Sequence, residues 1–229
     1  MKSEIVRSQK AGVLKKIGWA LMLFLSLMLF LLASRYLTLD PEVYFSEQRV
    51  VYIAHTTALI MHIVGAMLAT IIGPFQFLPG IRKGRFLNIH RWLGRAYLLG
   101  VLFGGLGGLY MAQFAYGGII SRVGFAGLGL LWLYSGIRAY MHIRNKEIEQ
   151  HREWITRNYA LTFAGVMLRL WVPTFTAVGI DFLLAYRIIA WLCWVPNLLV
   201  AQWIIQRRSQ RVDSLANTLS TQKTVQIEL

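Results

Sequence analysis

Six long apolar runs are the sequence feature that most constrains how this chain can fold. Each run has about 20 residues, the length at which a helix crosses about 30 Å of hydrocarbon. None of them alternates apolar and polar residues with a period of two, so transmembrane strands are not expected. The sequence therefore predicts an all-α polytopic membrane protein with six transmembrane helices, at residues 17–36, 51–73, 92–113, 120–141, 155–177 and 183–205.

Proline and glycine residues mark the breaks between these runs. Pro74 and Pro79 are expected to end the second helix, and Gly117–Gly118 to form a tight turn between the third and the fourth. Pro173 is expected to kink or end the fifth helix, because proline lacks the N–H that a helix needs at this position.

The distribution of Lys and Arg residues predicts the orientation. The chain carries 24 of them and a formal net charge of +14, and 19 fall in the N-terminal leader, the links after the second and fourth helices, and the tail. Four fall on the opposite side. Because cytoplasmic loops carry the excess of basic residues, we expect both termini in the cytoplasm and the protein in the inner membrane. Charges in such links do not form the basic face of a soluble nucleic-acid-binding domain, so no nucleic-acid partner is expected.

The chain is expected to divide into three segments. A basic cytoplasmic leader covers residues 1–16, a transmembrane domain covers 17–206, and a polar stretch without periodicity, 207–229, is predicted to be a disordered cytoplasmic tail. Helices two to five, within residues 50–175, hold nearly all the intramembrane polar groups and form the expected four-helix core. The leader is basic up to the first apolar run, which favours a retained signal anchor over a cleaved signal peptide. The single cysteine, Cys193, excludes an intrachain disulfide and a cysteine-based metal cluster.

A short repeat occurs at two predicted helix starts. The pattern W-x-x-R-x-Y-x-L occurs at residues 92–99 and again at 154–161, each time with His-Arg shortly upstream. Two hairpins of the same orientation would explain it. The ordinary use of Trp, Tyr and Arg at the headgroup level of a membrane would explain it equally well.

Arg169 is the charge that lies deepest in a predicted span. It stands 12 residues beyond Arg157, or about 18 Å along a helix. None of the ten acidic residues lies inside a span, which argues against a proton- or sodium-driven transporter. We therefore expect Arg169 to contact Glu47 or Asp181, backbone carbonyls near Pro173, or a bound anion such as a haem propionate, a quinone oxygen or a lipid phosphate. The alternative is a side chain that snorkels to the outer headgroups.

The histidines offer candidate ligands at one depth. His90, His142 and His151 lie at the cytoplasmic ends of helices three, four and five. A haem iron bound by two imidazoles needs them to face each other at one depth, so these three are the candidate metal ligands. The alternative is that they are interfacial cations beside lipid phosphate. His62, near the middle of helix two, has no histidine opposite it and is either hydrogen-bonded in the core or a ligand or proton carrier.

Glycines give helices three and four small faces. Such faces let neighbouring backbones approach closely, or they could admit a flat cofactor. The residues concerned are Gly100, Gly104, Gly105, Gly107, Gly108, Gly124, Gly127 and Gly129.

Four segments of the chain resemble a bacterial family of predicted membrane proteins catalogued only as a domain of unknown function. They are IMHIVGAMLATIIGPFQF, NIHRWLGRAYLLGV, LLWLYSGIRAYMHIR and HREWITRNYALTFAGVMLRLWVP. The resemblance covers about residues 50–175 and brings no established activity. It implies that the family signature includes His62, His90, Arg91, Gly94, His151, Arg152, Arg157 and Arg169.

A four-helix core with histidines is also similar to the two-haem b-type cytochromes and the ferric-reductase-like membrane proteins. Those proteins carry two histidines about four turns apart on one helix. Here only helix two carries two histidines, His55 and His62, and they are seven residues apart, about two turns. This resemblance therefore implies one haem rather than two.

Three hypotheses of function follow. The first is a membrane redox protein, with a membrane redox partner, that binds one haem b or a quinone in helices two to five; its candidate cofactor-binding residues are His62, His90, His142, His151, Arg157 and Arg169. The second is a non-enzymatic protein that binds or moves a lipid or a small amphipathic anion. The third is a structural subunit of a membrane complex. In each case the lipid bilayer is the expected surrounding, and none of the three specifies a catalysed reaction.

Overall fold

The fold is a bundle of α-helices, seen in a computed structural model that describes the backbone of residues 2–227 and the side chains of residues 12–210, 213 and 214. The described residues contain no strand. The helices are α1 (Lys2–Ser34), α2 (Arg49–Ala54), α3 (Thr56–Gln76), α4 (Leu87–Ala112), α5 (Ile119–Arg144), α6 (Ile148–Thr162), α7 (Ala164–Ala177), α8 (Phe182–Leu192) and α9 (Val195–Ile227). Short 3-10 turns occupy the links: η1 (Arg35–Thr38), η2 (Pro41–Val43), η3 (Ser46–Gln48), η4 (Pro79–Arg82) and η5 (Gly84–Phe86).

Six stretches of the described chain are long and apolar enough to cross a membrane, which confirms the predicted all-α architecture and number of spans. Two of them, the fifth and the sixth, are each built from two helices, α6 with α7 and α8 with α9. The spans are Gly12–Thr38, Thr56–Gln76, Gly84–Ala112, Ile119–Arg144, Ile148–Ala177 and Phe182–Gln210.

The breaks in the helices differ in part from the expected ones. α3 continues through Pro74 and ends at Gln76, and Pro173 lies within α7 without ending it. The fifth span is interrupted at Phe163 instead, where the N–H of Val166 bonds the Phe163 carbonyl at 3.0 Å in a tighter turn. The break between α8 and α9 precedes Pro196, whose missing N–H leaves the turn before it without one helical bond.

Glycines bring α3 and α4 into close contact. A Cβ atom at Gly65 would lie 2.3 Å from the Gly104 nitrogen, and one at Gly100 would lie 2.8 Å from the Gly65 oxygen. Only glycine permits this approach at both positions, because any side chain would overlap backbone atoms. The glycine face of α4 therefore serves helix packing against α3.

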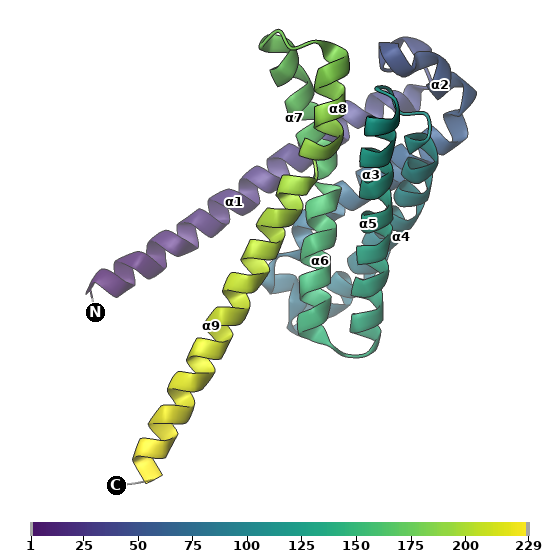
Figure 1. Cartoon of the computed structure of the whole chain (residues 1–229). Helices are drawn as coiled ribbons and strands as arrows, with labels where there is room; N and C mark the ends of the chain where they lie inside the picture. Colours follow the sequence, from purple (N-terminus) through teal and green to yellow (C-terminus); the bar gives the residue numbers. More distant parts are fainter. Residues whose placement is uncertain (1, 228–229) are drawn as a thin grey trace.

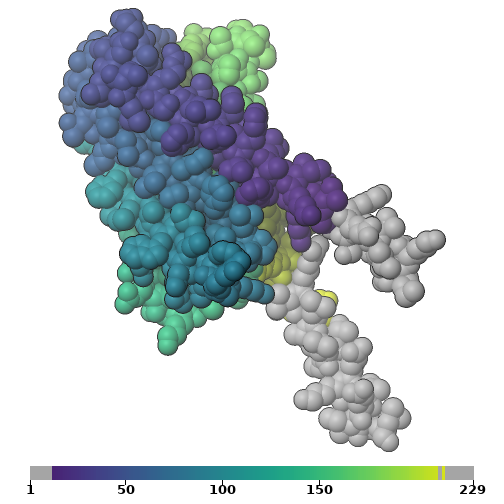
Figure 2. Space-filling model, turned by 180° about the vertical axis from the view of Figure 1, so that it is seen from behind, coloured from purple at the N-terminus to yellow at the C-terminus, as the bar shows by residue number. Residues whose placement is uncertain are grey.

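The first and last helices diverge from the bundle. α1 crosses it obliquely, against α3 and α7, and α9 leaves it beyond α6 (Figure 1). Figure 2 shows α1 lying across the surface of the bundle seen from behind. One end of the bundle carries α2 and is called the α2 end. The opposite end is called the α5–α6 end, and the turn between α5 and α6 and the link between α3 and α4 lie there.

The C-terminal segment is drawn as a helix, and the predicted disordered cytoplasmic tail stays a prediction. The backbone of residues 207–227 continues α9. This stretch contains neither glycine nor proline, so nothing in it interrupts a helix. The cytoplasmic location of both termini stays a prediction.

Candidate functional site

A buried polar network joins α4, α5 and α6 in the middle of the bundle. The Tyr97 hydroxyl donates to Asn158 Oδ1 at 2.6 Å and lies 2.9 Å from Thr162 Oγ1. Trp132 Nε1 donates to the same Thr162 oxygen at 2.8 Å, and Asn158 Nδ2 donates to the Trp132 carbonyl and to Ser135 Oγ. Each buried polar group has a partner, so the network fixes helix positions and offers no ligand site. Sequence analysis missed Asn158 and Thr162, although a polar residue within an apolar run is a signal that could have identified them.

Arg169 lies half-buried near the α2 end of the bundle. Its Nη1 donates to the Gly165 carbonyl, one turn earlier in α7, at 3.1 Å. Three tyrosines from separate segments, Tyr36, Tyr52 and Tyr186, interact electrostatically with the guanidinium. Among the described side chains, no ion pair includes Arg169. The observed hydrogen bond of the guanidinium is the one to the Gly165 carbonyl, and the three tyrosines act on the guanidinium electrostatically.

The two acids expected as partners of Arg169 make other contacts. The Asp181 carboxylate caps α8 by accepting from the Leu184 N–H at 3.0 Å. The Glu47 carboxylate accepts from its neighbour Ser46. Of the expected partners, a backbone carbonyl is the one observed, although it belongs to Gly165 and not to the turn before Pro173.

The tyrosines around Arg169 belong to a group of aromatic side chains that we call the collar. Its members are Tyr36, Tyr44, Phe45, Tyr52 and Tyr186. Tyr36 stacks on Tyr44 with ring centroids 5.6 Å apart, and Tyr44 meets Tyr52 edge-on at 6.0 Å. On the other side, Tyr186 stacks on Phe45 at 5.8 Å. The collar combines apolar ring faces with hydroxyl groups, the composition found where a helix bundle meets the membrane interface.

His62 is held within the core between α3 and α4. Its Nδ1 lies 2.7 Å from the Gly104 carbonyl, and because a carbonyl only accepts, this nitrogen carries the proton. A Cβ atom at Gly108 would lie 2.6 Å from the same nitrogen, so α4 closes over the ring. His62 also interacts electrostatically with Arg169, which places both groups in one region of the bundle.

The other three candidate histidines gather at the α5–α6 end. His142 Nδ1 pairs with the Glu147 carboxylate, and its Nε2 lies 3.2 Å from Arg138, so both ring nitrogens are engaged. His151 Nδ1 donates to the Ala139 carbonyl at 2.8 Å. His90 interacts electrostatically with His151, and its Nδ1 is buried without a hydrogen-bond partner.

The geometry at this end does not form a ready metal site. Within the described part of the chain, no group of three or more His, Cys, Asp or Glu residues is placed to hold a metal ion. A crevice between α3, α4 and α6 is closed so tightly that it has no room for a water molecule. Cofactor pockets usually measure about 300–1,000 Å³. A guest would therefore enter this crevice only if its walls moved apart.

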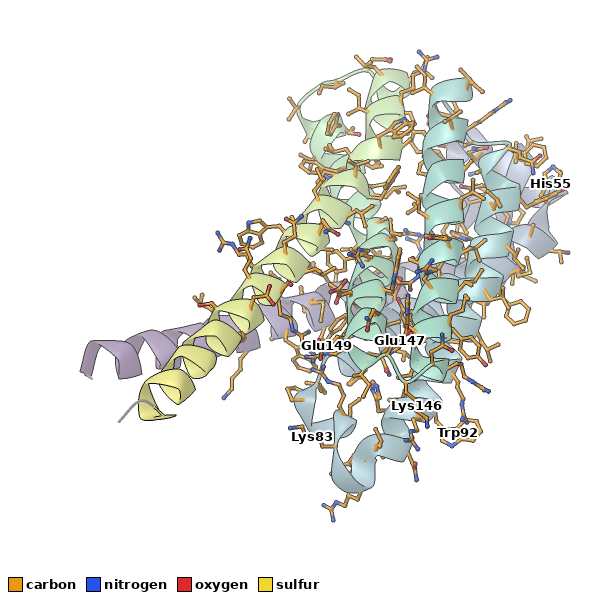
Figure 3. All side chains as sticks on the ribbon, turned by 60° about the horizontal axis from the view of Figure 1, so that its bottom comes forward. His55, Lys83, Trp92, Lys146, Glu147 and Glu149 are labelled. Atoms are coloured by element: carbon orange, nitrogen blue, oxygen red, sulfur yellow. The ribbon has the colours of Figure 1, made fainter. Side chains whose placement is uncertain are left out.

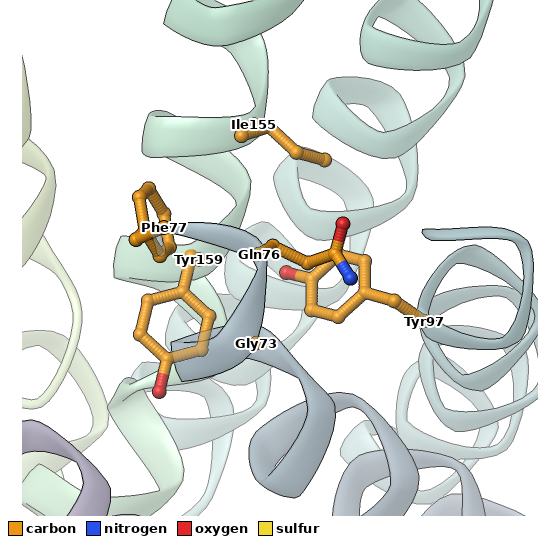
Figure 4. A pocket seen from close by; sticks show the side chains of 6 residues that line it. All are labelled: Gly73, Gln76, Phe77, Tyr97, Ile155 and Tyr159. Atoms are coloured by element: carbon orange, nitrogen blue, oxygen red, sulfur yellow. The ribbon is translucent and has the colours of Figure 1, made fainter. Parts of the chain in front are cut away.

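Gln76 is the polar side chain that lines the crevice. Its amide is 7% exposed, and its Nε2 has no hydrogen-bond partner. The rest of the wall is formed by Gly73, Phe77, Tyr97, Ile155 and Tyr159 (Figure 4). A buried amide donor without an acceptor costs free energy, so an oxygen acceptor that reached Gln76 would stabilise it.

α1 covers the bundle close to the crevice. The Tyr159 hydroxyl lies 3.0 Å from Ser26 Oγ, and Trp19 Nε1 donates to the Pro74 carbonyl at 2.9 Å. These bonds join α1 to α6 and to the last turn of α3.

Basic side chains surround the same end of the bundle. Arg82 donates to the carbonyls of Phe77 and Leu78, at 2.7 and 3.3 Å. Arg152 and Arg208 share the Glu149 carboxylate, at 2.7 and 2.9 Å. Figure 3, which labels Lys83, Glu147 and Glu149, shows charged side chains gathered here. Burial first, and then Arg152 and Arg208, lower the pKa of Arg82 below its usual value.

The two copies of the short repeat have the same local geometry. Arg95 stacks over Trp92 at 4.7 Å, and Arg157 stacks over Trp154 at 4.8 Å. Arg157 also donates to Gln202 Oε1 at 3.1 Å. This candidate therefore links α6 to α9 and is less available to a ligand than Arg82.

Fold and sites together define a polytopic helical membrane protein with, at each end of its bundle, a basic group that forms no ion pair among the described side chains. The chain belongs to the family described as "Predicted membrane protein (DUF2306)", whose family model matches residues 59–205. This confirms the expected membership of a membrane family without assigned function, and the match includes α8 and part of α9, beyond the segment of resemblance. No curated protein and no solved structure matches the chain.

Proposed function

We propose that this protein binds an anionic amphiphile, a phosphate-bearing lipid, beside Arg169 at the α2 end of its bundle. The supporting observation is a half-buried guanidinium within a span that has a backbone carbonyl and three tyrosines as neighbours, and no ion pair among the described residues. A charge in a membrane span is costly without a counter-charge. A phosphate would supply that charge and would accept hydrogen bonds from the guanidinium.

The side chains of the collar can contact the ester groups and the acyl chain of such a lipid. Hydroxyl groups of Tyr36, Tyr52 and Tyr186 can donate to phosphate or ester oxygens, while their rings offer apolar surface to an acyl chain. Binding requires no redox group and no catalytic base. The function that these residues support best is therefore recognition of the lipid.

The test compares two arginine variants in detergent. The purified protein is titrated with phosphatidylglycerol or with phosphatidylcholine while its thermal unfolding is followed. The wild type should be stabilised more by phosphatidylglycerol, and Arg169→Gln should weaken that binding by about tenfold or more, the usual worth of a charged hydrogen bond. Arg122→Gln changes an exposed charge near the same end and serves as the control. Equal responses of both variants would contradict the proposed site.

A second candidate function, binding of one haem b or a quinone with a membrane redox partner, is favoured by one observation. His90 Nδ1 is buried without a partner beside His151, whose Nε2 makes no bond to another described residue. His142 suits the role less, because both its nitrogens are engaged. Protein purified from haem-supplied cells should then show a reduced-minus-oxidised spectrum that His90→Ala removes. A colourless preparation without a pyridine-haemochrome signal would exclude the haem version.

A further inference from the structure

Three arginines at the α5–α6 end share too few acids to be neutralised. Arg152 and Arg208 both pair with Glu149. Arg82 interacts with both of these arginines, and no ion pair among the described side chains includes it. The group of four residues therefore carries a surplus of two positive charges. An anion placed here would reduce the repulsion between the guanidinium groups.

The position of Arg82 is fixed while part of its donor set stays available. Its Nε and Nη2 donate to the Leu78 and Phe77 carbonyls, which hold the planar group against the link after α3. Five N–H bonds project from a guanidinium, and these two contacts use two of them. The remaining N–H groups can bind an oxyanion, for which the planar fork geometry is well suited.

Phe77 connects this cationic group to the crevice. Its carbonyl accepts from Arg82, while its side chain lines the crevice with Gln76. The unpartnered Gln76 Nε2 is a neutral donor in apolar surroundings, and Figure 4 shows its amide among the aromatic side chains of the wall. A ligand for both features needs a negative group for the arginines and, on an apolar body, a neutral acceptor for Gln76.

The membrane supplies molecules with this pattern. Trp92 and Trp154, each stacked by an arginine, lie in the second turns of α4 and α6, and Trp beside Arg is typical of the headgroup level of a bilayer. A phospholipid carries its ester carbonyl between the phosphate and the acyl chains. The neighbouring α1 diverges from the bundle towards the N-terminus (Figure 1), and its outward side chains are exposed.

We propose that the α5–α6 end holds a second site, for one anionic phospholipid, with its phosphate on Arg82 and the Arg152–Glu149–Arg208 group, and an ester carbonyl that accepts from Gln76 Nε2 after the Gln76 side chain turns out of the closed crevice. The site does not depend on Arg169. It takes the phosphate and glycerol ester together, so a free phosphate ion satisfies only part of it.

The test uses two variants from separate halves of the site. Thermal unfolding in detergent is followed with phosphatidylglycerol, phosphatidylcholine or inorganic phosphate. Arg82→Gln should weaken the phosphatidylglycerol-specific binding by about tenfold. Gln76→Leu removes the buried unpartnered donor, so it should leave the lipid-free protein as stable as the wild type or more stable, and should still reduce binding. Bound lipids counted by native mass spectrometry should fall by one in each variant.

The controls separate this site from its alternatives. Arg85→Gln removes an exposed arginine from the same link and should bind lipid like the wild type. Arg169→Gln should keep this site, so failure here and failure beside Arg169 are distinguishable. Equal loss in Arg82→Gln and Arg85→Gln would overturn the proposal, as would an unchanged response of Gln76→Leu. Stabilisation by inorganic phosphate equal to that by phosphatidylglycerol would show a free-phosphate site instead.

Discussion

The imidazole of His62 donates through Nδ1 to the carbonyl oxygen of Gly104, 2.7 Å away on the neighbouring helix. This bond joins α3 to α4 at the point where glycines bring the two backbones closest. The histidine that the sequence offers as a ligand or proton carrier therefore has a structural partner. Its other nitrogen remains an acceptor.

Replacing His62 by alanine should destabilise the protein by about 1–3 kcal/mol, because the Gly104 carbonyl loses its side-chain partner and the ring leaves a gap. Thermal or denaturant-induced unfolding in detergent measures the change. His55→Ala, which removes a stacked histidine at the end of the same span, should cost less. A His62 variant as stable as the wild type would show that the bond contributes little.

Replacing Gly65 by alanine should cost about 1–3 kcal/mol or more, because the new Cβ would meet backbone atoms of α4 at 2.3–2.6 Å and push the helices apart. Gly18→Ala is the matched control, since no atom lies within 4 Å of a Cβ there. It should be neutral or slightly stabilising, as alanine favours a helix more than glycine does. The same unfolding measurement distinguishes the two variants.

Hydropathy predicted the architecture because this signal is local, whereas the orientation that the charges predict stays a prediction. The length of each apolar run specifies a span, and Gly100 and Gly104 indicated the close helix contact that α3 and α4 make. The surroundings of Arg169 could not be predicted in this way. Tyr36, Tyr52 and Tyr186 come from three separate segments, and only the tertiary fold brings them to one guanidinium.

At the α5–α6 end, too, the sequence predicted only part of the site. The sequence predicts His90, His142 and His151 at one depth, and in the structure His90 and His142 each interact electrostatically with His151. It did not single out Arg82, because a basic residue in a link has the same local pattern whether it is paired or not. The break at Phe163 was also missed, since no proline or glycine occupies that position.

Replacing Glu149 by glutamine should strengthen phosphatidylglycerol binding severalfold, because Arg152 and Arg208 lose their shared counter-charge and become available to phosphate. The lipid-dependent rise in unfolding temperature, taken relative to each lipid-free variant, measures the effect. Glu153→Gln is the control, because this carboxylate pairs with Arg157 one turn further along α6. Weaker binding in Glu149→Gln would mean that Glu149 organises the site rather than competing with the lipid.

The most direct measurement of the central claim is photo-crosslinking with a phosphatidylglycerol that carries a diazirine on its acyl chain close to the glycerol. After irradiation in nanodiscs, the labelled peptides are mapped by mass spectrometry. The wild type should be labelled on the peptides around Arg169 and the collar of Tyr36, Tyr52 and Tyr186, and Arg169→Gln should lose that labelling while Arg122→Gln keeps it. Labelling spread evenly over the outward faces of the helices, and unchanged in Arg169→Gln, would contradict a lipid site beside this arginine.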